Sequence, residues 1–230
     1  MLKPPIMPAP TEILDRLQKY LSVTVTQQTL ALSCGTSDGR VNSLENERQI
    51  SQALGFYAAS NEWFQEHKLE LKVSEARHWY DFAVHRKDGV FIPVNVKVST
   101  LETADNISSK KGVFYALTGV LPEEVNISTW ERFSEELANR FCPTPIADYY
   151  FLVVGKKHPN EVFWTSLKNI NVLVANGNNP PFQCNWGINR IRTNRSDIEA
   201  GKYILKILRE TFRLRAEALR SFDQHLTRHL

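Results

Sequence analysis

The sequence predicts an α+β fold in which helices flank a central mixed β-sheet. Apolar residues recur at helical spacing near both ends of the chain, whereas alternating and β-branched stretches fill residues 68–98. A chain of 230 residues with 42% hydrophobic content can bury one sizeable core. We therefore expect a single domain over residues 1–230.

The elements follow one another in a regular order. Ile13, Leu14 and Leu17 predict a first helix, and a cap at Asn42 or Ser43 predicts a second, LENERQISQAL. Strand patterns follow in KLELKV, DFAVHR and VFIPVNVKV, and the Asp88-Gly89 pair predicts a hairpin between the last two. Helical patterns return in KKGVFYALTG and TWERFSEELANRF. The strands DYYFLVVG and EVFWTSL come next, joined by a turn at 158–160, and several of these strands are expected to form one sheet.

Composition narrows the class of protein. The net charge of +3 is mildly basic, so the distribution of charge is more informative than its sum. Cys34, Cys142 and Cys184 include no C-x-x-C pair, which argues against a disulfide framework or a zinc ribbon. No run approaches the roughly 20 apolar residues of a membrane span, and the start MLKPPIMPAP lacks the layout of a signal peptide. We expect a soluble, cytoplasmic protein without membrane contact.

Three polar residues gather on the predicted hairpin. Asp81 opens its first strand, and Asn95-Val96-Lys97 lies on its second strand after thirteen intervening residues. Because side chains alternate between the faces of a strand, Asn95 and Lys97 share a face, and the neighbouring strand can bring Asp81 beside them. One interpretation is an ordinary Asp81–Lys97 ion pair with Asn95 as a polar edge residue. The other is a catalytic site, because an ammonium group among β-branched residues is costly to bury without a role.

This pattern resembles the PD-(D/E)xK nuclease superfamily, most closely the type II restriction endonucleases, over about residues 40–100. In those enzymes a first acid and an acid-x-Lys triplet lie at the ends of such a hairpin. Here Tyr80 stands at the position of the family's proline and Asn95 at that of the second acid, an N-x-K form that some of these enzymes carry. Glu47, on the preceding helix, corresponds to an auxiliary acid of relatives. The stretch after Lys97 looks like the crossover to the helix that follows the catalytic strand.

The resemblance implies Mg²⁺-dependent hydrolysis of double-stranded DNA at a specific short palindrome, as in a restriction-modification system, without an organic cofactor. Asp81, the Asn95 amide oxygen and the Val96 carbonyl would hold the metal, because Mg²⁺ prefers oxygen ligands. Lys97 would orient or deprotonate the attacking water, with Glu47 as an auxiliary catalytic acid. A homodimer would match the symmetry of the DNA. The alternatives are a repair nickase or junction-resolving nuclease of the same fold, and a non-catalytic DNA-binding protein.

The DNA contacts are expected in the last third of the chain. Residues 168–195 are rich in Asn, Gln and Arg, side chains that pair with base edges in the major groove. The candidates for base contacts are Asn178, Asn179, Gln183, Asn185, Asn189, Arg190, Arg192, Asn194 and Arg195. A final helix over about 197–226 opens with the S-x-x-E capping pattern at Ser196. Its basic stripe, namely Lys202, Lys206, Arg209, Arg213 and Arg220, is either a solvated face or a phosphate-binding surface.

The histidines show no metal-binding spacing, and His78 and His85 are expected to be structural or near a phosphate.

Overall fold

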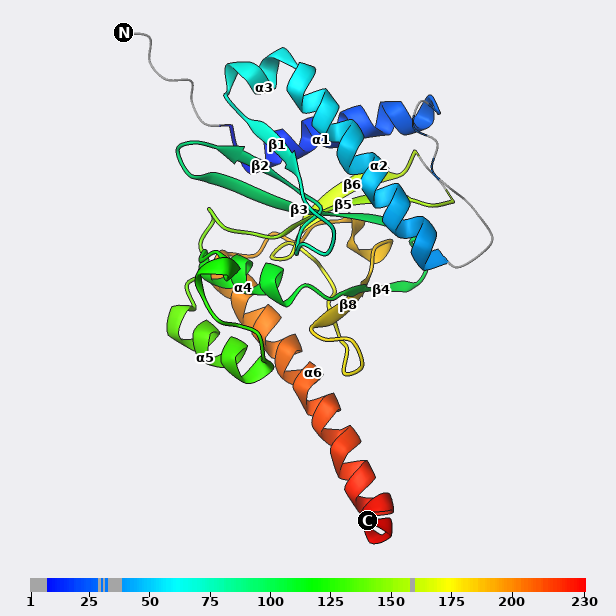
Figure 1. The fold of residues 1–230 in the computed structure, drawn as a ribbon, viewed down its shortest axis with the longest axis vertical. Helices are drawn as coiled ribbons and strands as arrows, with labels where there is room; N and C mark the ends of the chain where they lie inside the picture. Colours follow the sequence, from blue (N-terminus) through cyan, green and yellow to red (C-terminus); the bar gives the residue numbers. More distant parts are fainter. Residues whose placement is uncertain (1–7, 29, 31, 33–38, 158–159) are drawn as a thin grey trace. The chain divides into compact units, whose positions relative to one another are not determined.

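The computed structural model describes residues 8–28, 30, 32, 39–157 and 160–230 (Figure 1). The chain forms two compact units where the sequence predicts a single domain. Unit 1 comprises Met1–Leu101 and Ala147–Leu167, and unit 2 comprises Glu102–Ile146 and Lys168–Leu230. The fold is α+β, as expected.

Unit 1 is built on a five-stranded mixed sheet. Its strands are β1 (Glu70–Val73), β2 (Phe82–Arg86), β3 (Val90–Ser99), β5 (Tyr150–Gly155) and β6 (Val162–Ser166), in the order β1-β2-β3-β5-β6. The pairs β1–β2, β2–β3 and β5–β6 are antiparallel, whereas β3 and β5 are parallel. The parallel pair makes the sheet mixed, because the chain makes a long crossover between these two strands.

Helices α1 (Pro10–Thr26) and α2 (Gly39–Ser60) cover one face of this sheet, and the short α3 (Glu62–Glu66) follows α2 (Figure 1). Alternation along β3 buries Val94, Val96 and Val98 in the same hydrophobic core as Ile50 and Leu54 of α2. Asn95 and Lys97 therefore belong to the opposite face of the sheet. The fold thus separates the apolar and polar residues of β3 in the way that the alternating sequence predicts.

The hairpin prediction is confirmed. The β2–β3 register runs from Arg86↔Val90 to Phe82↔Val94, and Gly89 adopts φ +99°, a conformation that favours glycine. The start of the second helix is wrong, because α2 begins at Gly39 and not at a cap on Asn42 or Ser43. The turn expected at 158–160 falls partly on residues 158–159, which lie outside the described residues.

The strands predicted over residues 68–98 and 148–167 form the one sheet of unit 1, as expected, and unit 2 contains a second sheet that this expectation does not include. Its strands β4 (Ala104–Ile107), β8 (Phe182–Asn185) and β7 (Val174–Ala175) lie in the order β4-β8-β7, and both pairs are antiparallel. The predicted helices are present as α4 (Lys110–Thr118) and α5 (Trp130–Arg140). Short 3-10 turns occur at Pro122–Glu124, Ile188–Arg190 and Thr227–His229.

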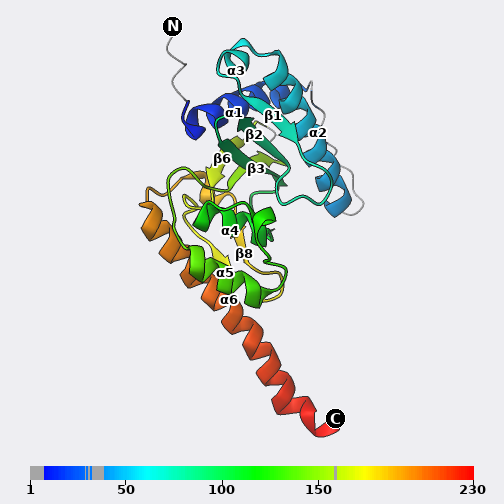
Figure 2. The same cartoon turned by 60° about the vertical axis from the view of Figure 1, so that its left-hand side comes forward.

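Helix α6 (Asp197–Leu226) is the longest element of unit 2. The predicted capping box is present, because the Ser196 hydroxyl accepts from the Glu199 backbone N–H while the Glu199 carboxylate accepts from the Ser196 backbone. The first half buries Ala200, Ile204 and Leu208, whereas every residue from Arg213 onward is exposed. Figure 2 shows this second half extending away from the other elements of its unit. No helix in the described part of the chain is long and apolar enough to cross a membrane.

Candidate active site

Asp81 lies immediately before β2, where two backbone hydrogen bonds hold it against its neighbours. Its N–H donates to the Val94 carbonyl and its carbonyl accepts from the Ser74 N–H, both at 2.9 Å. The preceding segment is anchored as well, because the buried Tyr149 hydroxyl donates to the Trp79 carbonyl at 2.6 Å. The backbone that presents Asp81 is therefore fixed on both sides.

The carboxylate of Asp81 points at β3. Its Oδ2 accepts a hydrogen bond from the Val96 backbone N–H at 2.6 Å. The β2–β3 register, continued by one residue, sets Asp81 opposite Asn95. The side chain of Asp81 thus takes the place of a strand partner where the β2–β3 ladder ends, and it is held beside the Asn95-Val96-Lys97 triplet.

Asn95 and Lys97 are half-buried on the face of the sheet opposite α1 and α2. The Asn95 amide makes no hydrogen bond to any residue that the structure describes, and Lys97 forms no salt bridge with any of them. The charge of Lys97 nevertheless acts on Asp81, where it offsets part of the rise in pKa that burial causes. An acid, an amide and an amine therefore converge, and the Asp81–Lys97 ion pair expected under the alternative interpretation does not form.

Burial has the largest effect on the pKa of the Asp81 carboxyl. Desolvation raises the pKa of Asp81 above its ordinary value, and the Val96 N–H and the Lys97 charge offset only part of that rise. A neighbouring positive charge would counter the rise, because it favours the ionised carboxylate. His85, which lies on β2 four residues after Asp81, has a lowered pKa because of burial and the charge of Lys72, and is expected to be neutral at pH 7.

The donor set fits a hard divalent cation. Asp81 supplies a carboxylate, Asn95 supplies an amide oxygen without a partner in the described part of the chain, and both are the oxygen ligands that Mg²⁺ accepts. The N–H and C=O of one strand residue point to the same side, so the Val96 carbonyl lies on the side of β3 that faces Asp81. No group of three or more His, Cys, Asp or Glu suited to a metal occurs among the described residues. A cation here would therefore depend on amide, carbonyl, water and substrate oxygens in addition to the carboxylate.

Glu47 is half-buried on α2, one turn before Ile50. Because α2 packs on the face of the sheet that carries Val94 and Val96, Glu47 belongs to a different layer from Asn95 and Lys97. Its auxiliary catalytic role stays a prediction.

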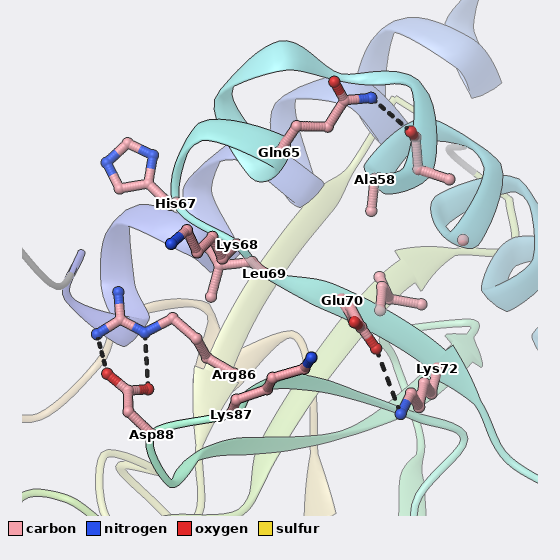
Figure 3. Close-up of a pocket in the computed structure, with 13 residues that line it drawn as sticks. Ala58, Gln65, His67, Lys68, Leu69, Glu70, Lys72, Arg86, Lys87 and Asp88 are labelled. Atoms are coloured by element: carbon pink, nitrogen blue, oxygen red, sulfur yellow. Dashed lines mark hydrogen bonds and ion pairs between the residues drawn. The ribbon is translucent and has the colours of Figure 1, made fainter. Parts of the chain in front are cut away.

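A cavity of about 900 Å³ in unit 1 lies apart from these residues. Figure 3 shows its lining, which comes from α2, α3 and the loop after it, β1, the end of β2 and the β2–β3 turn. Two ion pairs border it, Arg86–Asp88 and Lys72–Glu70. Asp81, Asn95 and Lys97 do not line this cavity, so the candidate site is separate from this pocket.

Several of the expected base-reading residues are engaged within unit 2. Asn189 is fully buried, and its amide bonds to the backbone of Val172 and Asn185. Arg195 donates to the carbonyls of Ile170 and Asn171 and lies over the Tyr203 ring. Asn185 and Gln183 are half-buried on β8, and the Asn185 amide bonds to the Glu102 carbonyl and the Ile188 N–H. The exposed candidates are Asn178, Asn179, Arg190, Arg192, Asn194 and Lys202.

The basic stripe of α6 is exposed in full. Its Arg213 pairs with Glu210 and Glu217 within the helix, which neutralises part of the stripe. Lys202, Lys206, Arg209 and Arg220 form no salt bridge with any described residue. These four cations remain the better candidates for phosphate contacts.

Sequence reasoning missed the aromatic cluster that supports Asp81. The rings of Trp79 and Tyr149 lie 5.8 Å apart, Trp79 and Tyr80 4.8 Å apart, and Tyr80 and Phe91 5.5 Å apart. The run of aromatic residues at 78–80 was the available signal.

A scan of protein-family models and a search of curated proteins gave no match to this chain.

Proposed function

We propose that this chain is a Mg²⁺-dependent endonuclease that cleaves double-stranded DNA at a specific sequence, as type II restriction endonucleases do. The observation that carries the proposal is the convergence of Asp81, Asn95 and Lys97, in which the Asp81 carboxylate is held against β3 by the Val96 N–H at 2.6 Å. An acid and an amine that were only a structural pair would be expected to form an ion pair, and these two do not.

The topology of unit 1 supports the same proposal. A helix, three antiparallel strands and a crossover to a strand parallel to the third follow in order, as α2, β1, β2, β3 and β5. The helix before the hairpin and the crossover after β3 are the parts of this order that the resemblance to restriction endonucleases implies. The Asn95-Val96-Lys97 triplet lies on β3, the strand from which the crossover departs.

Each residue has a distinct part in the proposed reaction. The Asp81 carboxylate, the Asn95 amide oxygen and the Val96 carbonyl would hold the cation. Bound Mg²⁺ would lower the pKa of a coordinated water and neutralise charge on the phosphate. Lys97 would donate hydrogen bonds from its ammonium group to the attacking water and to a phosphate oxygen, which stabilises the charge that develops there. Asn95 supplies an amide where the PD-(D/E)xK pattern has a second carboxylate. We therefore expect substrate phosphate to contribute to metal binding.

DNA would be held by the exposed cations and amides of unit 2. Lys202, Lys206 and Arg220 are suited to phosphates, and Arg190, Arg192 and Asn194 to base edges. Cutting both strands of a palindrome with one site per chain calls for a two-fold dimer. We therefore include a homodimer in the proposal.

The test is to map the ends produced on a sequenced plasmid in the presence of Mg²⁺. Discrete fragments with ends at one repeated sequence are the expected result, and EDTA should abolish them. Nicked circles, or cleavage of four-way junctions alone, would instead assign the site to a repair nickase or junction-resolving nuclease. A protein that binds DNA but cuts nothing with any divalent ion would be a DNA-binding module, an alternative favoured by the absence of an acidic cluster among the described residues.

A further inference from the structure

The second half of α6 presents an apolar stripe that no other element of its unit covers. Leu219, Phe222 and Leu226 are 63%, 43% and 47% exposed. They lie on the part of the helix that extends away from the rest of unit 2 (Figures 1 and 2). An isolated helical segment of this length is marginal in water unless its apolar face packs on something.

This stripe continues a groove on the first half of the same helix. The groove has a volume of about 310 Å³ and lies between α5 and α6, lined among others by Leu137, Ala138 and Phe141 on one side and Leu205, Arg209 and Phe212 on the other. Leu205, Phe212, Leu219 and Leu226 recur every seven residues. Such a seven-residue repeat places the groove residues and the exposed residues along one face of α6, as in a coiled-coil seam.

We propose that this face joins two copies of the chain through an antiparallel α6–α6′ contact, in which the free half of each helix enters the α5–α6 groove of its partner. In this arrangement Leu226 of one copy lies near Leu208 of the other. Phe222 lies near Phe212, and Leu219 lies near Arg215. The two-fold axis crosses the helices near Glu217. With α5 of each copy alongside, the contact becomes a four-helix bundle.

Charge selects the antiparallel direction. In the antiparallel arrangement Arg209, on the groove, meets Asp223 of the second copy, which is an attractive pair at the edge of the seam. A parallel arrangement would set Arg215 against Arg215 in the seam, and like charges there are unfavourable. In the antiparallel contact the Arg215 guanidinium can keep its hydrogen bond to the Gly177 carbonyl and present only its alkyl stem to Leu219.

A second copy is the occupant that fits best because the surface is self-complementary. An isologous dimer needs a protruding part and a receiving part on the same patch. Here the exposed stripe protrudes and the groove of the second copy receives it. Asp223 lies beside the stripe and Arg209 lines the groove, so their charges are complementary. The reason to expect a dimer at all rests on the proposed function, but the choice of surface rests on unit 2 alone.

The test is the mass of the full chain in solution, measured by sedimentation and light scattering without DNA. We expect a dimer for the natural chain and a monomer for Leu219→Glu and for Phe222→Glu. Ser221→Glu places the same charge on the outer side of the helix and should leave the dimer intact. All three positions are exposed, so none of these changes should disturb the fold of unit 2. A monomer at all concentrations, or a dimer that persists in both seam variants, would overturn the proposal.

A charge exchange tests the direction. Asp223→Arg should weaken the dimer by at least tenfold in Kd, and adding Arg209→Asp should restore it, because the pair is then inverted. Failure of the double variant to recover would overturn the antiparallel register. None of these measurements uses DNA cleavage. A failure of the dimer proposal therefore leaves the nuclease proposal standing, and a failure of the nuclease proposal leaves the dimer surface standing.

Discussion

Oδ2 of Asp81 and the backbone nitrogen of Val96 lie 2.6 Å apart, although the residues are 15 positions apart in sequence. This bond aims the carboxylate at the middle residue of the Asn95-Val96-Lys97 triplet. It also holds a half-buried acid next to a strand whose even-numbered residues belong to the hydrophobic core. The position therefore combines a fixed geometry with an unfavourable environment for charge, which is typical of functional carboxylates.

Asp81→Asn is expected to stabilise the protein at neutral pH. The raised pKa of Asp81 means that its ionised form costs stability in the folded state, and Asn keeps an acceptor for the Val96 N–H. Thermal unfolding should show a Tm a few degrees higher for the variant near pH 7. The difference should disappear as the pH falls through the folded and then the unfolded pKa of Asp81, because the natural side chain is then neutral in both states. A lower Tm for the variant at neutral pH would contradict this account.

Asn95→Asp is expected to strengthen metal binding. A second carboxylate adds a negative charge to the donor set, and affinity for hard divalent cations rises with the number of charged ligands, here by roughly tenfold. The dissociation constants for Mg²⁺ and Mn²⁺ can be measured by calorimetry. Asn95→Ala serves as the matched control and should bind more weakly than the natural chain. Equal affinity of all three proteins would place the metal elsewhere.

Tyr149→Phe is expected to loosen the segment that presents Asp81. It removes the buried hydroxyl that donates to the Trp79 carbonyl at 2.6 Å, and such a loss costs about 1 kcal/mol of the free energy of unfolding. The check is chemical denaturation together with Mg²⁺ affinity, which should fall as well. Tyr57→Phe is the control, because the Tyr57 hydroxyl has no hydrogen-bond partner among the described residues. Similar losses in the two variants would show that the hydroxyl bond is not responsible.

Ser196→Ala is expected to weaken the start of α6 by about 1 kcal/mol, because it removes one half of the capping box. The Ser196 hydroxyl and N–H hold the pKa of Glu199 below its usual value. The stabilisation from Glu199 is therefore present above its unfolded pKa and is lost as the pH falls through the lowered folded value. Far-UV circular dichroism during unfolding should detect both effects. Ser221→Ala, on the exposed half of the same helix, should leave the Tm unchanged or slightly higher.

The sequence predicted the β2–β3 hairpin well because local signals agree there. Alternation placed Val94 and Val96 on one face and Asn95 and Lys97 on the other, and Asp88-Gly89 supplied the turn. The Asp81–Val96 bond could not be predicted, because it depends on where the ladder between two strands ends. The face shared by Asn95 and Lys97 was predictable, whereas the absence of hydrogen bonds to the Asn95 amide and of salt bridges to Lys97 within the described part of the chain was not.

The second sheet and the base-reading segment show where sequence patterns fail. Strands β4 and β7 are short, and both pair with β8. Because β8 lies far from β4 in the sequence, no local periodicity indicates this pairing. Asn189 looked like an exposed reader of bases, but it satisfies backbone groups in the interior of unit 2. An amide side chain offers the same donors and acceptors to a buried backbone as to a base edge, so composition alone does not distinguish the two roles.

The most direct test of the central claim compares the natural chain with Lys97→Ala, measuring DNA binding and Mg²⁺-dependent cleavage on the same substrate. Lys72→Ala, an exposed lysine on the edge strand β1, is the matched control. We predict that the natural chain and the control cut the DNA, and that Lys97→Ala binds it with similar affinity but cuts at least a hundredfold more slowly. Undiminished cleavage by Lys97→Ala would contradict the proposed site, and the absence of cleavage by the natural chain with every divalent ion would contradict the proposed activity.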